Sequence, residues 1–285
     1  MLVEFLSRAM WAVLGIPALL ILAYMGGWWL FVPLALLIVV GLAEYYSGAM
    51  AGGYRPAVGL GFAVGVGLLA ATIFAPASAT EITVVLLAAL AAGSLVSVLR
   101  PGFKHTSVAS SAITVFGVVY VAVMMSFLAR LCQVDLPAAI GVEGLGEFWH
   151  RLGALVVVVI PVWFCDTFAF VAGKTWGQRR LAPNISPNKT VEGAIAGFLA
   201  ALLSALAITM WMGMPWYHSV VLGVLIGSMA QVGDLSSSIL KRNLEIDDFG
   251  TIFGAHGGFL DRFDGLLFNM PLVYYYLLLF FVILK

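Results

Sequence analysis

The stretch from Ala9 to Ala43 contains no Asp, Glu, Lys or Arg. A membrane-spanning helix needs about 20 mainly apolar residues, so this stretch is too long for a single crossing. Two adjacent glycines, Gly26 and Gly27, divide it, and we expect one helix on each side of them. The whole chain is 62% hydrophobic and 10% charged, with a mean hydropathy of +1.07, which lies outside the range of soluble proteins. The sequence therefore predicts an all-α, polytopic integral membrane protein.

Nine segments are long and apolar enough to be predicted as membrane spans. They are Ala9–Met25, Trp28–Tyr45, Ala57–Phe74, Ile82–Leu99, Ile113–Ala129, Leu152–Val171, Val191–Met212, Trp216–Gly233 and Leu266–Leu284. The eighth span becomes polar near its end, so we expect its helix to leave the hydrocarbon and continue toward Arg242. We divide the chain into an N-terminal region of five spans, residues 1–150, and a C-terminal catalytic region of four spans, residues 151–285.

The basic residues are distributed unequally between the two sides of the predicted bundle. The side that holds the N-terminus and the loops after even-numbered spans collects Arg8, Arg55, Arg100, Lys104, Lys174, Arg179, Arg180, Lys189, Lys241, Arg242 and Arg262. The other side holds Arg130, Arg151 and Lys285. Basic residues favour the cytoplasmic side, so we expect a multi-pass protein of the cell inner (cytoplasmic) membrane. Its N-terminus and both polar loops would be cytoplasmic, and its C-terminus outside. The formal net charge of zero gives no bulk attraction to nucleic acid.

The first polar loop follows the sixth predicted span. Asp166 lies more than a turn inside that span, where an unpaired carboxylate is costly. We therefore expect it to face the protein interior and to meet a cation or a metal ion. Lys174 and Lys189 provide positive charge suited to a polyanion. Ser186 followed by Pro187 is typical of a helix N-cap and first helical position, which would place a helix N-terminus near a bound anion. An ordinary positive-inside loop with a capped helix also explains this segment.

The second polar stretch runs from Asp234 to Asp264 and contains several carboxylates. Asp261 and Asp264 are three residues apart and would share one face of a helix. Carboxylates at such spacing can hold one Mg²⁺ or a pair of metal ions. Asp234, Asp261 and Asp264 are the main candidate ligands, with Asp166 and Asp248 as further candidates.

The same stretch contains groups suited to phosphate, because cations and glycine backbone bind phosphate oxygens. If the residues after Asp234 are helical, Asp234, Ser238 and Lys241 lie on one face. The candidate phosphate-binding groups are Ser238, Lys241, Arg242, His256, Gly257, Gly258 and Arg262. Each of these features alone also fits a solvated helix face or an ordinary turn. Together, beside a bilayer, they predict a site for phosphate and metal.

Two groups of motifs resemble one enzyme family. The stretch Ser238-x-Leu240-Lys241-Arg242, a charged pair four residues later, and His256-Gly257-Gly258-x-x-Asp261-Arg262-x-Asp264 resemble the signature of the phosphatidate cytidylyltransferases, also called CDP-diacylglycerol synthases. The stretches Asp166-Thr167-x-Ala169-x-x-x-Gly173-Lys174-x-x-Gly177 and Ser186-Pro187-x-Lys189-Thr190-x-Glu192-Gly193 are similar to the same family. The motifs cover roughly residues 165–265. Asp247 stands where the family usually has Lys, so one cation of the phosphate site is missing or replaced, and Gly254 stands where proline is frequent.

The resemblance implies the transfer of the cytidylyl group of CTP to phosphatidate, giving CDP-diacylglycerol and pyrophosphate. It implies Mg²⁺ as cofactor, with a second cation such as K⁺ or another divalent ion. The implied catalytic residues are Asp234, Lys241, His256, Asp261 and Asp264. The implied substrate-binding residues are Lys174, Lys189, Ser238, Arg242, Gly257, Gly258 and Arg262. The expected partners are CTP, phosphatidate, the lipid bilayer and, by analogy, a second subunit in a homodimer.

Two alternatives fit parts of the sequence. A CTP-dependent enzyme acting on another lipid, such as an ether-lipid CDP synthase or a polyprenol kinase, would carry similar phosphate and metal groups. A transporter could use Glu44 and Asp166 in an ion path, but transporter sites lie near the bilayer midplane and this chain gathers its polar residues on one side. Glu44 is otherwise a structural group near the cytoplasmic end of the second span, or lines the same cavity.

Overall fold

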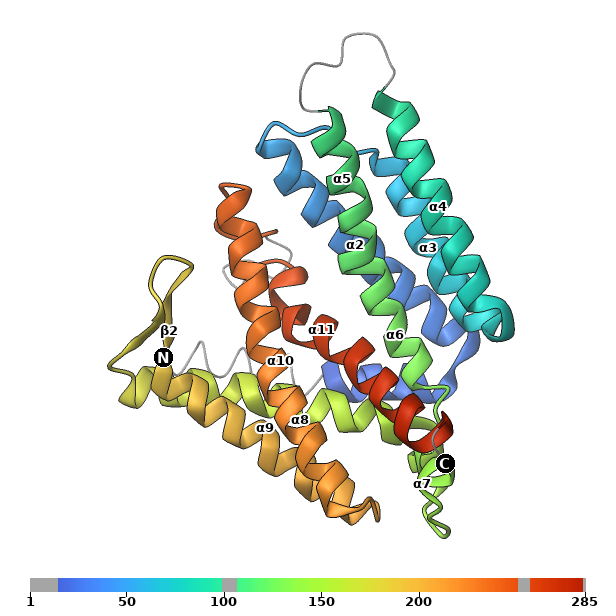
Figure 1. Cartoon of the computed structure of the whole chain (residues 1–285), viewed down its shortest axis with the longest axis vertical. Coiled ribbons are helices and arrows are strands. Elements are labelled where there is room, and N and C mark those ends of the chain that lie inside the picture. The colour runs from blue at the N-terminus through green and yellow to red at the C-terminus, as the bar shows by residue number, and fades with distance from the viewer. Residues whose placement is uncertain (1–14, 99–106, 251–256, 284–285) are drawn as a thin grey trace. The chain divides into compact units, whose positions relative to one another are not determined.

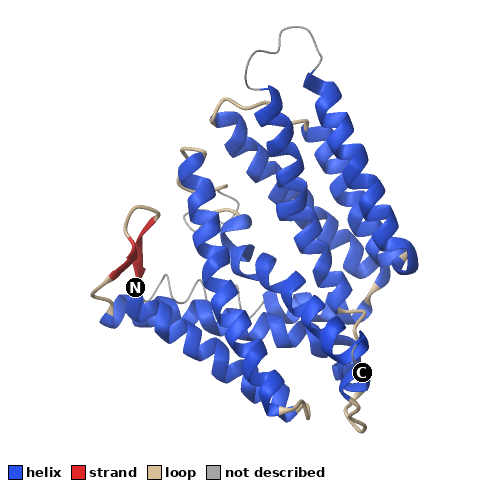
Figure 2. Ribbon diagram, in the orientation of Figure 1, coloured by secondary structure: helices blue, strands red, loops and turns tan. Residues whose placement is uncertain are grey.

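The computed structural model describes residues 15–98, 107–250 and 257–283, and helices dominate it (Figure 2). A helix at Gly15–Met25 comes before the labelled elements. The longer helices are α2 (Gly27–Ala51), α3 (Val58–Phe74), α4 (Ala79–Val98), α8 (Glu147–Trp176), α9 (Val191–Trp211), α10 (Trp216–Asn243) and α11 (Leu260–Leu277). The shorter ones are α5 (Ser107–Gly117), α6 (Met124–Leu131) and α7 (Leu136–Ile140). One antiparallel hairpin, β1 (Arg180–Ala182) and β2 (Ser186–Thr190), is an exception to the all-α prediction.

The helices confirm a polytopic membrane protein. Within the described residues, 7 helices are long and apolar enough to cross a membrane, and Gly15–Met25 and Val58–Phe74 are shorter apolar helices. Each overlaps a predicted span, and the number of nine crossings stays a prediction. The predicted break between the first two helices is also confirmed, because Gly26 and Gly27 have φ angles of 62° and 51°, a region that favours glycine.

Contacts divide the chain into two compact units, and both units are assembled from distant parts of the sequence. Unit 1 comprises Met1–Leu30, Arg130–Gln231 and Asn269–Lys285, and unit 2 comprises Phe31–Ala129 and Val232–Phe268. This grouping differs from a division at residue 150. Helices α10 and α11 each begin in one unit and end in the other.

In unit 2, α2 packs closely on α3 and on the helix that continues from α5 into α6. A Cβ atom on Gly65 of α3 would lie 3.0 Å from Leu42 and 3.1 Å from Ala122. The hydroxyl of Tyr46 donates to the carbonyl oxygen of Thr114 at 2.9 Å. Small residues at helix contacts are typical of membrane bundles, where close backbone approach supplies the packing energy.

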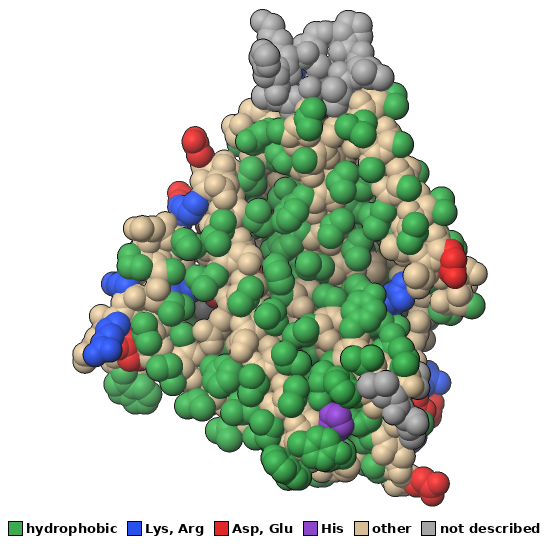
Figure 3. Space-filling view, viewed as in Figure 1, with side chains coloured by type: hydrophobic (Ala, Val, Ile, Leu, Met, Phe, Trp, Pro, Cys, Tyr) green, Lys and Arg blue, Asp and Glu red, His purple; other side chains and the backbone are tan. Residues whose placement is uncertain are grey.

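In unit 1, α8 and α9 lie side by side over most of their length (Figure 1). A Cβ atom on Gly197 of α9 would lie 2.7 Å from the carbonyl oxygen of Cys165 and 2.9 Å from Ala169. Hydrophobic side chains cover much of the visible surface of the protein (Figure 3), and they include large exposed groups such as Leu36 and Leu203. Such a surface suits contact with lipid.

Candidate active site

The end of α10 and the start of α11 meet where the acidic residues lie. A Cβ atom on Gly233 would come within 2.5 Å of the carbonyl oxygen of Asp264, so the two helices are in backbone contact beside Asp234. Helix α10 continues to Asn243, which confirms that Asp234, Ser238 and Lys241 share a helix face. Helix α11 begins at Leu260, so Asp261 and Asp264 lie in its first two turns.

Asp261 contacts both helices and the segment between them. Its Oδ1 accepts a hydrogen bond from Lys241 Nζ at 2.7 Å, and its Oδ2 accepts from the N–H groups of Gly258 at 2.9 Å and Phe249 at 3.1 Å. The side chains of Asp261 and Lys241 are 9% and 15% exposed. Asp261 therefore joins α10, α11 and the segment before α11, and it holds the Lys241 ammonium group in place.

Gly257 lies between two carboxylates. Its φ angle is 82°, and a Cβ atom there would lie 3.0 Å from Asp261 Oδ2 and 3.3 Å from Asp248 Oδ1. The backbone conformation therefore favours glycine, and a Cβ atom would crowd both carboxylates. The adjacent Gly258 already donates its N–H to Asp261, so that group is engaged by the protein.

The carboxylates of this region fit a divalent cation only in part. Among residues 15–98, 107–250 and 257–283, no group of three or more His, Cys, Asp and Glu side chains could hold a metal ion. The structure therefore does not assemble Asp234, Asp261 and Asp264 into a three-ligand set. One carboxylate oxygen each of Asp248 and Asp261 lies beside Gly257. Mg²⁺ is usually bound by one or two carboxylates together with substrate phosphates, so this oxygen donor set fits it, and the ligand roles stay predictions.

The other candidate residues of the second polar stretch differ in their burial. Arg242 Nη1 lies 3.1 Å from Asp247 Oδ1 in an ion pair whose side chains are 50% and 94% exposed. Asp247, which departs from the family pattern, is thus matched by a neighbouring cation. The buried Ser238 hydroxyl donates to the carbonyl oxygen of Asp234 at 3.0 Å. Arg262 follows Asp261 on α11 and is half-buried, and His256 lies outside the described residues.

The first polar loop differs from its prediction at the start of α9. Ser186 and Pro187 belong to β2, not to a helix, and α9 begins at Val191 with Thr190 as its N-cap. The Thr190 hydroxyl accepts the N–H of Gly193 at 3.2 Å. The prediction of a helix start at Ser186 was wrong because pairing with β1 keeps Ser186–Thr190 extended.

The other residues of this loop belong to unit 1. Lys174 is exposed near the end of α8, with its ammonium group 4.8 Å from the centre of the Phe170 ring. Lys189 lies on β2 and is half-buried. The side chain of Asp166 is exposed, so the expectation that it faces the interior was wrong. Its neighbour Cys165 occupies the buried position against α9, and one residue along a helix turns the side chain by about 100°.

Two residues of unit 2 contribute to this region in ways that their local sequence does not indicate. Glu44 of α2 is 6% exposed, and its carboxylate accepts the N–H groups of Phe259 and Leu260. Tyr120 lies in a π-helical segment, Val118–Val123, and its buried ring has its centre 6.2 Å from that of Phe268 on α11. Glu44 could be identified from the sequence because it is a charged residue inside an apolar span, but its partners could not. No sequence signal identified Tyr120.

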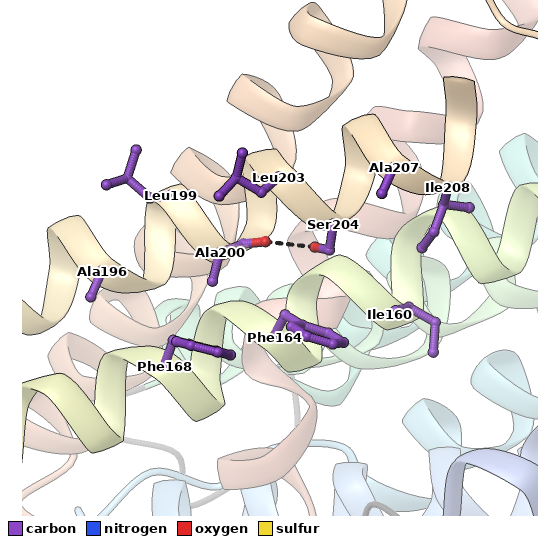
Figure 4. Close-up of a pocket in the computed structure, with 10 residues that line it drawn as sticks. All are labelled: Ile160, Phe164, Phe168, Ala196, Leu199, Ala200, Leu203, Ser204, Ala207 and Ile208. Atoms are coloured by element: carbon purple, nitrogen blue, oxygen red, sulfur yellow. Dashed lines mark hydrogen bonds between the residues drawn. The ribbon is translucent and has the colours of Figure 1, made fainter. Parts of the chain in front are cut away.

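An apolar groove lies between α8 and α9 in unit 1 (Figure 4). Its volume is about 600 Å³, and it is lined by Ile160, Phe164, Phe168, Ala196, Leu199, Ala200, Leu203, Ser204, Ala207 and Ile208. The hydroxyl of Ser204 donates to the carbonyl oxygen of Ala200 at 2.7 Å. The groove is therefore suited to hydrocarbon rather than to a polar headgroup.

Comparison with known proteins agrees with the motifs. The model of the cytidylyltransferase family matches residues 6–280. A phosphatidate cytidylyltransferase of Synechocystis sp. is 32% identical over 290 residues, which cover 96% of each chain. A phosphatidate cytidylyltransferase of Bacillus subtilis is 41% identical over 46% of this chain and 49% of its own length. That of Aquifex aeolicus is 41% identical over 42% and 45%. This protein therefore belongs to the cytidylyltransferase family.

Proposed function

We propose that this protein transfers the cytidylyl group of CTP to phosphatidate, which gives CDP-diacylglycerol for phospholipid synthesis and pyrophosphate. The observation that carries this function is the similarity to a phosphatidate cytidylyltransferase over 96% of both chains. The cluster of Lys241, Asp248 and Asp261 supports it, because phosphoryl-type transfers depend on cations and metal-binding carboxylates around the reacting phosphates.

The reaction requires no strong protein base. The second pKa of a phosphate monoester is about 6, so the phosphate of phosphatidate is mostly dianionic near neutral pH. One of its oxygens attacks the α-phosphorus of CTP, a new P–O bond forms, and the bond to the β-phosphate oxygen breaks to release pyrophosphate. The task of the protein is to align two polyanions that repel each other and to stabilise the leaving group.

The cations of both polar loops have defined roles in this proposal. Lys241, Arg242, Arg262 and His256 contact the phosphates of CTP or of the lipid, and Ser238 positions one of them. Lys174 and Lys189 orient the triphosphate. Lys241 forms an ion pair with Asp261, and this contact orients its ammonium group before substrate binds.

The carboxylates hold Mg²⁺ in this proposal. Asp234, Asp261 and Asp264 are the proposed ligands, with Asp248 and Asp166 as further ones and a second cation such as K⁺ or another divalent ion. The position of Asp248 and Asp261 on either side of Gly257 supports a cation whose remaining ligands are substrate phosphates. When bound, Mg²⁺ supplies positive charge to the phosphate oxygens of the transition state.

The proposed topology has nine membrane crossings in the cell inner membrane. The unequal distribution of Lys and Arg supports a cytoplasmic N-terminus, a cytoplasmic active site and a C-terminus outside. At the cytoplasmic face, soluble CTP meets the phosphatidate headgroup while the acyl chains stay in the bilayer. Assembly as a homodimer is a further part of the proposal.

A direct assay tests the function. Purified protein in detergent micelles is incubated with radiolabelled CTP, phosphatidate and Mg²⁺, with and without a chelator. The expected products are CDP-diacylglycerol and pyrophosphate, formed only without the chelator. Release of CDP would instead identify a lipid kinase. A product formed with ether-linked substrates but not with phosphatidate would identify an enzyme that acts on another lipid.

A further inference from the structure

The carboxylate of Glu44 lies at the start of the helix that carries the Asp261-Arg262-x-Asp264 motif. Oε1 of Glu44 accepts the N–H of Phe259 at 2.8 Å, and Oε2 accepts the N–H of Leu260 at 3.0 Å. Residues 44 and 259 are 215 positions apart in the sequence. The first N–H groups of a helix have no partner within the helix and attract negative charge. Glu44 therefore supplies, from another helix, the cap that α11 requires.

The same carboxylate also contacts the backbone on both sides of the 251–256 segment. A Cβ atom on Gly258 would lie 2.6 Å from both oxygens of Glu44, and one on Gly250 would lie 2.7 Å from its Cδ. Asp261 binds the neighbouring N–H groups of Phe249 and Gly258. Two carboxylates, Glu44 and Asp261, thus hold residues 249–250 and 257–260 in fixed positions.

The face of α2 that carries Glu44 packs on this region along two turns. A Cβ atom on Gly41 would lie 3.2 Å from the side chains of Phe259 and Leu260, and one on Gly48 would lie 2.7 Å from Ile246. Gly41, Glu44 and Gly48 are three and four residues apart, so they occupy one face of the helix. The small residues allow α2 to come close enough for the Glu44 carboxylate to reach the backbone of α11.

We propose that Glu44 is a positioning residue for the cytidylyl transfer. It fixes the N-terminus of α11, and with it Asp261, Arg262 and Asp264, without contacting either substrate. This inference rests on the proposed function. A misplacement of catalytic groups by about 1 Å can lower a rate about 100-fold, so a change at Glu44 should lower kcat while it leaves substrate affinity nearly unchanged.

The test compares Glu44→Gln with Leu42→Ala. Gln keeps the size of the side chain and one oxygen acceptor, but its amide group faces the second N–H. Leu42 is a fully buried residue of the same helix that packs on Gly65 of α3, so its truncation measures a loss of core packing away from α11. Each variant is purified as the full chain in detergent, and activity is expressed per amount of monodisperse protein. Hydrogen exchange is followed in peptides that cover residues 257–265.

The expected results differ between the two variants. Glu44→Gln lowers kcat by about 10- to 100-fold, with the KM for CTP within about threefold, and the amides at the start of α11 exchange at least about 10-fold faster because one loses its acceptor. Glu44→Asp, whose side chain is too short to reach both N–H groups, does not restore kcat. Leu42→Ala lowers the melting temperature but keeps kcat within about twofold and leaves the exchange of α11 unchanged.

Three outcomes would overturn the inference. Unchanged hydrogen exchange in Glu44→Gln means that the carboxylate does not anchor α11. Hydrogen exchange tests this anchor even if the wild-type protein forms no CDP-diacylglycerol and the proposed function fails. Faster exchange with kcat close to wild type means that the anchor does not position the catalytic groups. A loss of activity that only parallels the loss of folded protein, as in Leu42→Ala, means that Glu44 is structural alone.

Discussion

The ion pair between Lys241 and Asp261 should be strongly coupled in a double-mutant cycle. Lys241 Nζ contacts Asp261 Oδ1, whereas both backbone N–H donors contact Oδ2. Asp261→Asn can therefore keep an oxygen for the two N–H groups while its amide group faces the Lys241 ammonium. Because these side chains are 15% and 9% exposed, the variant leaves a mostly buried cation without its partner, at a cost of about 3 kcal/mol.

The second arm of the cycle removes the cation. In Lys241→Met the Asp261 carboxylate keeps its two backbone donors, so we expect a smaller loss of about 2 kcal/mol, that of one hydrogen bond to a charged group. The double variant has neither the cation nor the carboxylate and should resemble Lys241→Met. The sum of the two single losses of unfolding free energy should therefore exceed the loss in the double variant by about 2–3 kcal/mol.

The assay is the free energy of unfolding of each variant in mild detergent, titrated with SDS and followed by circular dichroism. The matched control is the cycle of Arg242→Gln and Asp247→Asn, an ion pair on the same helix end that is 50% and 94% exposed and should couple by less than about 1 kcal/mol. Additivity of the Lys241 and Asp261 variants within about 0.5 kcal/mol would refute the reasoning. Turnover should be lost in all three variants of the first cycle, because both residues belong to the proposed catalytic set.

Three further predictions concern the metal, the loop and the hairpin. A chelator should abolish CDP-diacylglycerol formation and added Mg²⁺ should restore it. Full activity in the presence of the chelator would contradict the proposal that the carboxylates bind Mg²⁺. Gly257→Ala should lower stability by about 1–3 kcal/mol and abolish turnover, since its φ of 82° and two nearby carboxylates exclude a side chain; wild-type melting and kcat would disprove this. Thr190→Ala should lower stability by about 1 kcal/mol through loss of the α9 N-cap, while Thr190→Ser should retain the cap and the stability. Equal melting temperatures of the two variants would show that the hydroxyl cap does not stabilise α9.

The helical positions of the candidate residues were predictable because they depend on local spacing. The continuation of α10 to Asn243 places Asp234, Ser238 and Lys241 on one face whatever the helix packs against. The break at Gly26 and Gly27 is likewise a property of the glycine backbone. The start of α9 was not predictable in this way, because Ser186 and Pro187 carry a plausible cap and only pairing with β1 makes them extended.

The repeated crossing of the membrane could be predicted from the length and apolarity of each segment, which leave its backbone no better state than a helix in lipid. The motifs, whose spacing is local, also identified the family. Which charges meet depends on the folded chain: Glu44 caps a helix 215 positions away, Lys241 pairs with Asp261, and Asp166 is exposed while Cys165 is buried. Such partners depend on how helices approach one another, and that depends on packing among residues far apart in the chain.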